Sequence, residues 1–424
     1  MKNHTRLHVQ QSSIWFSFCL LALVVGASHL THAQTETDIA FFSTTITYAG
    51  VTFDSAGNLY GVTYNGGNSP NCGGVGSGCG TVFELSPAGG TTWTQTTIYN
   101  FQNRADGALP LGGLTFDSAG NLYGSNFGST GGGSSHGGVA FELSPASGNS
   151  WTFTPLYTFD QTKETVPPSS SLTIDAAGNL YGVTYFGGRY SNGSAFELSN
   201  KGGVWRETIL HSFGGPGDGA QPYGPLVIDS EGNLYGTTSA GGSMGRGTVF
   251  QLSRQSSGIW RENLLYTFPS SGGASQAGLI FDSAHNLYGT TLVGGTYGAG
   301  GVFRLTRVKQ NGNVGWKYVQ LYNFTNGADG GGPASPLTFD ASGNLYGTDS
   351  YDPNVCGNPF YGCWQVFKLS VGASGLWQIS ALYPIPEAAD AGNVGLVLDS
   401  SGDIFGTGYD NQYFSWGEVY EVTQ

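Results

Sequence analysis

The chain has little charge and few of the residues that favour exposed helices. Charged residues make up 10% of its 424 residues, against roughly 25% in an average soluble protein. No stretch repeats apolar residues with the period of an amphipathic helix. Glycine, with 71 residues, and aromatic residues, at 13%, are abundant instead. These features argue against a helical bundle and predict an all-β protein with many turns.

Basic residues are the scarcer of the two charged classes. Fifteen Lys and Arg residues stand against 28 Asp and Glu residues, which gives a formal net charge of −13 at pH 7. A surface of that sign repels the phosphates of nucleic acids and the head groups of anionic lipids. No segment concentrates basic residues into a local patch. We therefore expect no nucleic-acid partner.

Long hydrophobic segments are confined to residues 1–33, which have the features of a secretory signal peptide. The basic residues Lys2 and Arg6 precede an apolar stretch over 14–27, and Ala33 ends a small-residue cleavage motif. The apolar stretch is shorter than the roughly 20 residues needed to span a bilayer. We expect no membrane span, cleavage of residues 1–33, and a secreted or periplasmic mature protein.

Cysteine is rare, and the four cysteines beyond the signal peptide form two equally spaced pairs: Cys72, Cys79, Cys356 and Cys363. Each pair stands in the same place before a phenylalanine of a repeated unit. Equal spacing favours two local disulfides, as in an oxidising compartment. The alternative is a zinc site, which needs the four thiols to converge or histidines to join them. The mature chain holds only three histidines: His136, His211 and His285.

What the chain has in abundance is one nonapeptide, "FDSAGNLYG", written seven times with small changes. Its aspartates are Asp54, Asp117, Asp175, Asp229, Asp282, Asp340 and Asp399. Each unit carries four short apolar and aromatic runs separated by Gly, Ser, Pro and Asn clusters. Seven units of four strands predict a single domain over 34–424, a seven-bladed β-propeller of four-stranded antiparallel blades.

The nonapeptide is interpreted as a turn between the first and second strands of a blade. Asp117 in the second copy begins a type I turn and accepts backbone hydrogen bonds, while Gly120 supplies a positive φ. His285 replaces this glycine in the fifth copy, and histidine tolerates that conformation at some cost. We favour this structural role over a catalytic or metal-binding aspartate, because carboxylates on seven separate hairpins lie too far apart to cooperate.

The two ends of the chain predict how the ring closes. The seventh unit stops after its third strand, "GEVYEVTQ", and an extra apolar run, "DIAFFSTTITY", precedes the first unit. We expect the N-terminal run to supply the missing outer strand of the last blade, because this removes an open sheet edge. The aromatic residues that recur in every unit are expected to pack between neighbouring blades.

The unit "DGxxP…GLxxDxxGNLYGTTxxGG…GTVFELS…LYxF" resembles the GloVer tandem-repeat family of exported bacterial proteins. The match covers nearly all of residues 50–424, and the pattern is more loosely similar to NHL-type seven-bladed propellers. The resemblance implies a propeller repeat and export. It implies no activity, so function has to be argued from the candidate sites.

The first candidate site is a carboxylate that recurs in the blade-to-blade connections, eleven residues before the turn aspartate: Asp106, Glu164, Asp218 and Asp329. Gathered near the central channel, these groups would suit Ca²⁺, which prefers carboxylate and carbonyl oxygens. The alternative is a repeated Asp-Gly turn that ends at a proline.

The second candidate site is a set of aromatic residues outside the repeat register, in the loops of the last two blades: Tyr351, Phe360, Tyr361, Trp364, Tyr409, Tyr413, Phe414 and Trp416. Exposed rings beside Asn and Asp suit a carbohydrate or a protein partner. The alternative is that these loops pack on their own rings.

No nucleophile triad in sequence order, nucleotide-binding loop or zinc-protease motif is present. His211 lies in a strand run and is expected in the core. The preferred hypothesis is an exported, monomeric, non-catalytic module without a cofactor that binds a glycan or a protein through its loop face. One alternative is a metal-assisted lyase or lactone hydrolase with the connection carboxylates at the channel. Another is a structural component of the cell envelope.

Overall fold

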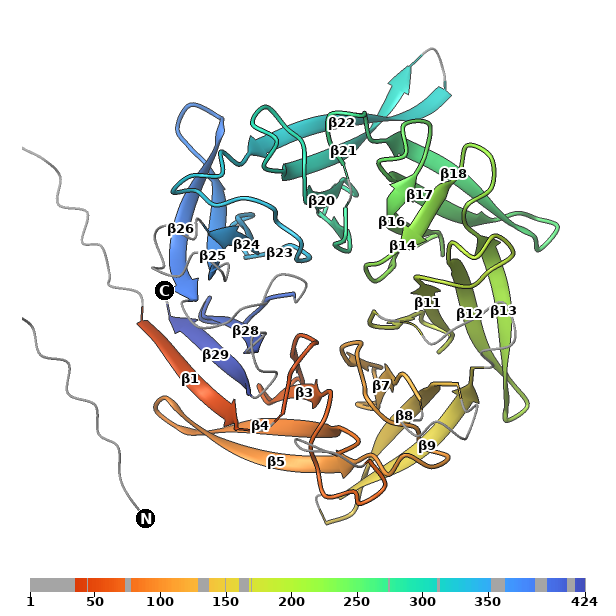
Figure 1. The fold of residues 1–424 in the computed structure, drawn as a ribbon, viewed down its shortest axis with the longest axis vertical. Coiled ribbons are helices and arrows are strands. Elements are labelled where there is room, and N and C mark those ends of the chain that lie inside the picture. Colours follow the sequence, from red (N-terminus) through yellow and green to blue (C-terminus); the bar gives the residue numbers. More distant parts are fainter. Residues whose placement is uncertain are drawn as a thin grey trace, which may run out of the picture. The chain divides into compact units, whose positions relative to one another are not determined.

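Seven antiparallel sheets are arranged as the blades of a ring in the computed structural model (Figure 1). The structure describes residues 35–43, 45–72, 78–128, 137–148, 150–159, 168, 170–273, 275–310, 313–351, 363–385, 395–409 and 416–423. Every secondary-structure element in these ranges is a β-strand, which confirms the predicted all-β propeller. None of the described residues forms a helix that could cross a membrane.

The first six blades each use one sequence unit, and their strands follow chain order from the axis outward (Figure 1). Blade 1 contains β2 (Thr52–Phe53), β3 (Leu59–Thr63), β4 (Thr81–Gly89) and β5 (Thr92–Asn100). Blade 2 contains β6 (Thr115–Phe116), β7 (Leu122–Ser125), β8 (Val139–Ala146) and β9 (Ser150–Thr158). Blade 3 contains β10 (Thr173–Ile174), β11 (Leu180–Thr184), β12 (Ser194–Lys201) and β13 (Val204–Ser212).

Blade 4 has one additional short strand. It contains β15 (Val227–Ile228), β16 (Leu234–Gly241), β17 (Thr248–Arg254) and β18 (Trp260–Thr267), and β14 (Gly219–Pro222) pairs with the far end of β16. Blade 5 contains β19 (Ile280–Phe281), β20 (Leu287–Thr291), β21 (Gly301–Gln310) and β22 (Asn313–Asn323). Blade 6 contains β23 (Thr338–Phe339), β24 (Leu345–Tyr351), β25 (Cys363–Val371) and β26 (Trp377–Ile385).

Blade 7 is assembled from both ends of the chain. Its inner strands are β27 (Val397–Leu398), β28 (Ile404–Tyr409) and β29 (Gly417–Thr423), and its outer strand is β1 (Thr35–Phe42). Strand β1 pairs antiparallel with β29, so the edge that β29 would otherwise expose is covered. The predicted closure of the ring by an N-terminal strand is confirmed.

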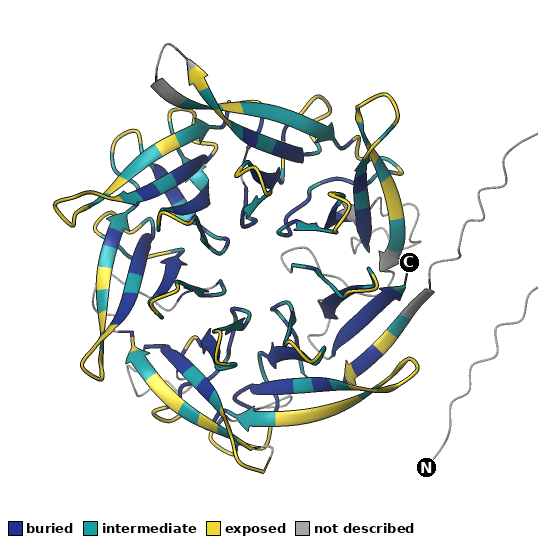
Figure 2. Ribbon diagram, turned by 180° about the vertical axis from the view of Figure 1, so that it is seen from behind, coloured by how far each residue is buried: buried dark blue, intermediate teal, exposed yellow. Residues whose placement is uncertain are grey.

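The hydrophobic core is divided into seven clusters, one between each pair of neighbouring blades. Buried residues occupy mainly the second and third strands of the blades, and exposed residues lie on the outermost strands and the hairpin turns (Figure 2). Phe141 of the third strand is fully buried. Tyr60 packs edge-on against Phe116 of the next blade, with ring centroids 5.2 Å apart. Burial of each such ring contributes about 2–3 kcal/mol, so the recurring aromatics form the core as predicted.

Each copy of the nonapeptide is a hydrogen-bonded turn. In the second copy, Asp117 Oδ1 accepts the N–H groups of Ala119 and Asn121 at 2.8 and 2.9 Å. Asp117 Oδ2 accepts Asn121 Nδ2–H at 2.8 Å and the Tyr123 hydroxyl at 3.1 Å. Burial raises the pKa of Asp117, but these hydrogen bonds outweigh burial and lower it. The carboxylate is used within its own turn, which supports the structural interpretation.

Glycine is needed at two positions of the nonapeptide for different physical reasons. Gly120 takes φ 86° and donates its N–H to the Asp117 carbonyl oxygen, as the turn requires. His285 takes the same conformation in the fifth copy, with φ 61°. Gly124 is required by close packing instead, because a Cβ there would lie 2.6 Å from Cζ of Phe141. The motif therefore combines a turn with a glycine that leaves room for a buried phenylalanine ring.

Candidate functional site

A cavity of about 490 Å³ lies where the blade-to-blade connections meet around the axis. Its walls come from connections of several blades, including residues 48–51, 111–114 and 223–225, and from Tyr409 at the end of β28. In an antiparallel blade these connections share one face of the propeller with the loops between the second and third strands. The cavity therefore opens on the face where the sequence places variable loops.

The cavity lining combines aromatic rings with neutral polar groups. Three tyrosines, two serines and one glutamine line it, and none of the described lining residues is charged. The ring of Tyr48 lies edge-on between Tyr64 and Tyr409, with centroids 4.9 and 4.7 Å away. Tyr223 packs edge-on against Tyr185 at 5.8 Å. Ser170 is buried in the wall, and its Oγ has no hydrogen-bond partner within the described structure.

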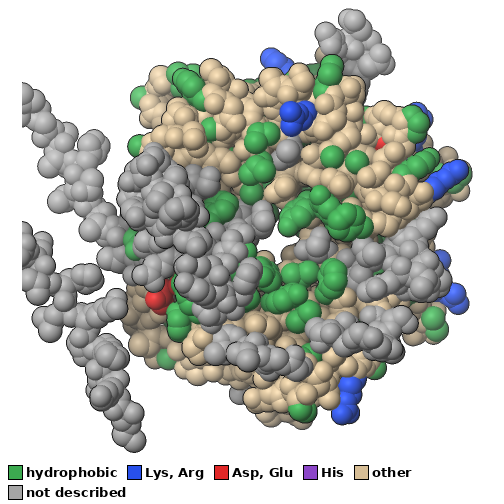
Figure 3. All heavy atoms as spheres, viewed as in Figure 1, with side chains coloured by type: hydrophobic (Ala, Val, Ile, Leu, Met, Phe, Trp, Pro, Cys, Tyr) green, Lys and Arg blue, Asp and Glu red, His purple; other side chains and the backbone are tan. Residues whose placement is uncertain are grey.

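Exposed apolar side chains continue outward from this cavity. Phe127, Phe186, Val293 and Tyr297 lie in loops between second and third strands and are 47%, 59%, 37% and 63% exposed. Hydrophobic side chains gather around the central opening in Figure 3, and the visible Lys and Arg side chains lie away from it. The described loops of this face thus expose apolar and aromatic side chains near the central hollow.

The structure separates the aromatic residues predicted for the last two blades. Tyr409 lines the central cavity and is buried. Trp416 packs against Phe41 of β1 with ring centroids 5.7 Å apart, and Trp364 packs against the hydrophobic cluster between blades 6 and 7. Strand β24 ends at Tyr351. The other candidates lie outside the described residues: Phe360, Tyr361, Tyr413 and Phe414.

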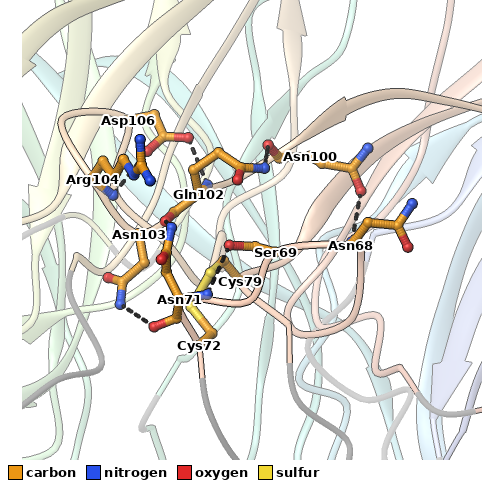
Figure 4. The surroundings of a disulfide bond; sticks show 10 residues. All are labelled: Asn68, Ser69, Asn71, Cys72, Cys79, Asn100, Gln102, Asn103, Arg104 and Asp106. Carbon is orange, nitrogen blue, oxygen red and sulfur yellow. Dashed lines mark hydrogen bonds between the residues drawn. A yellow bond between two sulfur atoms is a disulfide. The ribbon is translucent and has the colours of Figure 1, made fainter.

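The connection aspartates bind groups of their own connection. Asp106 Oδ2 accepts the Gln102 N–H at 2.7 Å, and Oδ1 accepts the Arg104 N–H at 3.0 Å (Figure 4). Asp106 Oδ2 also accepts the Tyr99 hydroxyl at 3.0 Å. Asp329 likewise accepts the Tyr322 hydroxyl at 2.9 Å and the Thr325 N–H at 3.0 Å.

The described members of this set are Asp106, Asp218 and Asp329, and none of them lines the central cavity. Glu164 lies outside the described residues. Each of these aspartates follows its tyrosine or histidine partner by seven residues. This constant offset from the "LYxF" run can be seen in the sequence. That offset is the signal that identifies the local role of these carboxylates.

The first predicted disulfide, between Cys72 and Cys79, is confirmed. The chain just before Cys72 is held to the connection after blade 1, because Asn71 Nδ2–H donates to the Gln102 carbonyl at 2.7 Å (Figure 4). Cys356 lies outside the described residues, so the second pair stays a prediction. A disulfide is consistent with an extracellular location.

An ionisable cluster lies between the outer strands of blades 3 and 4. His211 Nε2 is 2.9 Å from Asp218 Oδ2 and 3.7 Å from Glu262 Oε2. Burial and the neighbouring Asp218 raise the pKa of Glu262 to about 9. Burial also raises the pKa of Asp218, but its interactions with His211 and Glu262 outweigh burial and lower it.

The expectation that His211 belongs to the core is wrong. Its side chain is 23% exposed, because it stands at the outer end of β13 and faces two carboxyl groups. Sequence reasoning did not identify Glu262, which comes from the following blade. The signal for this residue is its position two residues after the tryptophan that starts β18, a position held by Phe153 in blade 2 and Tyr318 in blade 5.

Three solved structures are similar to the chain at low sequence identity. A protein of unknown function from Dyadobacter fermentans is 10% identical with a TM-score of 0.46, over 92% of this chain and all of that one. An ancestral GH74 enzyme is 9% identical with a TM-score of 0.51, over 89% of this chain and 47% of that one. An alpha-L-arabinanase from Penicillium chrysogenum, complexed with arabinobiose, is 12% identical with a TM-score of 0.45, over 92% of this chain and 98% of that one.

No curated protein sequence shows significant similarity to the chain. The model of the Gloeobacter/Verrucomicrobia repeat matches it twice, over residues 46–277 and 168–375. Together these matches span most of the propeller, including six of the seven nonapeptide turns. The chain belongs to the Gloeobacter/Verrucomicrobia repeat family.

Proposed function

We propose that the protein is an exported, non-catalytic carbohydrate-binding propeller that holds a neutral glycan at the central cavity of its loop face. The observation that carries this proposal is the composition of the cavity wall. Tyrosine rings and neutral hydrogen-bonding groups line it, and no described lining residue is charged. A phosphorylated or carboxylated ligand would find no cationic partner among these residues.

The chemistry of a sugar matches this wall. A pyranose presents apolar C–H groups on its faces and hydroxyl groups around its edge. A tyrosine presents an apolar ring and a polar tip in the same way. Ser170, Ser171 and Gln276 add donors and acceptors, and Ser170 Oγ lacks a protein partner within the described residues. The volume of about 490 Å³ lies within the usual range of small-ligand sites.

The proposal is for binding without cleavage. Most glycoside hydrolases place two carboxyl groups about 5–10 Å apart on either side of the scissile bond. No Asp or Glu is present among the described residues that line the cavity. The described connection aspartates, Asp106, Asp218 and Asp329, bind local donors instead. This supports a recognition role over the alternative of a channel enzyme.

The exposed rings around the cavity extend the proposed surface. Phe127 and Phe186 are at least 47% exposed, in loops that share the face of the cavity. A ligand longer than the cavity would therefore contact rings outside it. We expect affinity to rise with the length of the glycan, because each added sugar can cover further apolar surface.

The test is a screen of neutral oligosaccharides, followed by calorimetry of the best ligand with two tyrosine variants. Tyr223→Ala removes a cavity ring and should weaken binding at least 10-fold, equivalent to about 1.4 kcal/mol. Tyr297→Ala is the matched control for a ligand short enough to fit the cavity, because that ring is 63% exposed and does not line the cavity. Melting curves establish that both variants are folded.

Two outcomes would contradict the proposal. One is a screen in which no neutral glycan binds. The other is a ligand whose affinity survives Tyr223→Ala and is lost with Tyr297→Ala, which would move the site to the outer loops. A Trp416→Ala variant then tests the aromatic residues of blade 7. The ring of Trp416 packs against Phe41 in the free protein.

A further inference from the structure

Three potential metal ligands converge between blades 3 and 4. One ligand atom from each of His211, Asp218 and Glu262 lies within 4.8 Å of the other two. His211 is near the end of β13, Asp218 begins the turn into β14, and Glu262 comes from β18 of the next blade. The cluster therefore joins two blades through side chains that no single sequence segment contains. None of the three residues lines the central cavity, so this cluster is separate from the proposed glycan site.

The burial of the two carboxyl groups is an independent sign of a missing partner. The Asp218 side chain is 10% exposed, and the Glu262 side chain is 13% exposed. Asp218 Oδ1 and Glu262 Oε1 are buried and accept no hydrogen bond from the described residues. A buried carboxylate oxygen without a donor is costly, and a cation removes that cost.

The spacing of the ligand atoms fits a small divalent ion. Ligand atoms around a tetrahedral zinc ion lie about 3.4 Å apart, because Zn–N and Zn–O bonds are about 2.0–2.2 Å long. The two distances from His211 Nε2, 2.9 and 3.7 Å, lie on either side of that value. The carboxyl oxygens of Asp218 and Glu262 lie within 4.8 Å of each other, so the two groups would close on the ion, with solvent as the fourth ligand at the exposed edge of His211.

We propose that His211, Asp218 and Glu262 form a binding site for a divalent transition-metal ion of the zinc class at the joint between blades 3 and 4. One imidazole nitrogen with two carboxylates favours Zn²⁺ over Ca²⁺ and Mg²⁺, which prefer sets of six or more oxygen ligands. Two carboxylates and a neutral imidazole also carry the charge that balances a divalent cation. Bound there, the ion links two blades from the outside.

The other blades show that this cluster is a local departure from the repeat. The position of His211 is a tyrosine in blades 1, 2, 4 and 5: Tyr99, Tyr157, Tyr266 and Tyr322. Tyr322 donates to Asp329 at 2.9 Å in the same way that His211 pairs with Asp218. A structural partner for the aspartate is therefore available without histidine, and the histidine adds the nitrogen that a metal needs.

The test is metal binding to the exported protein, purified without a polyhistidine tag and stripped with EDTA. Calorimetry and elemental analysis with ZnCl₂ should show one ion per chain, while CaCl₂ and MgCl₂ should show no binding. His211→Tyr installs the residue of the other blades and should weaken Zn²⁺ binding more than 10-fold, as should Glu262→Gln. Asp329→Asn is the matched control at the same repeat position and should leave zinc affinity unchanged.

The melting temperature separates loss of the site from loss of the fold. Without metal, the His211→Tyr variant should have the same melting temperature as the unsubstituted protein. Only the unsubstituted protein should gain stability on addition of Zn²⁺. Absence of stoichiometric zinc would overturn the proposal. Zinc binding that survives both His211→Tyr and Glu262→Gln would also overturn it, because the ion would then be held elsewhere.

Discussion

The outer ends of two neighbouring blade joints differ in chemistry at the same repeat positions. Between blades 4 and 5, Tyr266 stacks on Tyr318 with ring centroids 4.2 Å apart and an interplanar angle of 13°. Between blades 3 and 4, the corresponding residues are His211 and Glu262, 3.7 Å apart. Yet both joints keep a buried cluster of Phe, Leu and Val further in.

Two further joints fall between these extremes. Tyr99 stacks on Phe153 at 4.5 Å between blades 1 and 2, and Tyr157 donates to Glu207 at 3.0 Å between blades 2 and 3. The inner cluster therefore supplies the burial that holds blades together, while the outer position is free to change chemistry. A repeat protein can acquire a site there without loss of its fold.

The largest effect should come from truncation of the aromatic joint. Tyr318→Ala removes a ring that contacts Tyr266 and Phe303, and should cost about 3 kcal/mol of unfolding free energy. Glu262→Ala at the polar joint should cost less than about 1 kcal/mol, because the His211–Asp218 pair survives. Urea unfolding of both variants measures the difference. Equal losses would mean that the two joints contribute equally to stability.

A second repeat position sharpens the comparison. Blade 6 has an aspartic acid there, Asp349, and blade 2 has the neutral isostere, Asn126. Asn126 accepts the Val139 N–H at 3.0 Å and donates to the Asp106 carbonyl at 2.7 Å. Asp349 is fully buried, and neither carboxyl oxygen has a hydrogen-bond partner among the described residues. Burial raises the pKa of Asp349 well above its ordinary value and outweighs the opposite effect of the neighbouring Gln365 side chain, while the charge of Asp329 raises the pKa further.

Asp349→Asn should therefore stabilise the protein by at least about 1.4 kcal/mol at pH 8, because the amide needs no proton and each unit of pKa difference between folded and unfolded Asp349 is worth about that much. The folded chain holds a proton on Asp349 that the unfolded chain releases above about pH 4, so stability is lost as the pH rises. Melting curves at several pH values should show the advantage of the variant vanish near pH 4. An advantage that does not change with pH would refute the buried proton.

The fifth nonapeptide turn gives a smaller effect. His285 has φ 61°, a region that favours glycine, and the other turns have glycine at this position. His285→Gly should raise stability by about 1 kcal/mol, because it removes the strain of a side chain in the left-handed region. Denaturant titration measures the change, and Gly120→Ala in the second turn should shift stability in the opposite direction.

The smallest effect is expected for His211→Tyr in metal-free protein. Tyr99 and Tyr322 bond their aspartates from the same position, so a tyrosine at 211 should keep the hydrogen bond to Asp218. We expect a change in unfolding free energy below about 0.5 kcal/mol. A large loss in differential scanning calorimetry would show that the histidine is essential to the joint itself.

Much of the fold could be predicted because the same physical problem recurs in every unit. Each unit must form a turn at its aspartate and seat a phenylalanine against a glycine, and these requirements act between residues close in sequence. The closing strand could be predicted from a missing fourth strand in the seventh unit. The hydrogen bonds from the asparagine and tyrosine side chains to the turn aspartate were not foreseen.

The candidate sites were less predictable because they combine residues from different blades. The connection aspartates looked like a common set, yet each binds a residue seven positions earlier in its own unit. The cavity wall brings Tyr48 and Tyr223 from two connections together with Tyr409 at the end of β28, and only Tyr409 was a candidate beforehand. The offset of Glu262 from the β18 tryptophan gained meaning only once β18 was placed beside β13.

The blade, the number of blades and the closure of the ring could be predicted from the amino acids alone, because turn formation and strand pairing depend on residues within one unit or at its ends. Which side chains meet across a joint or around the axis became known only from the folded chain. Those contacts depend on the angle between rigid sheets. The repeat pattern defines each sheet, but the packing of large buried rings between sheets sets how the next one lies against it.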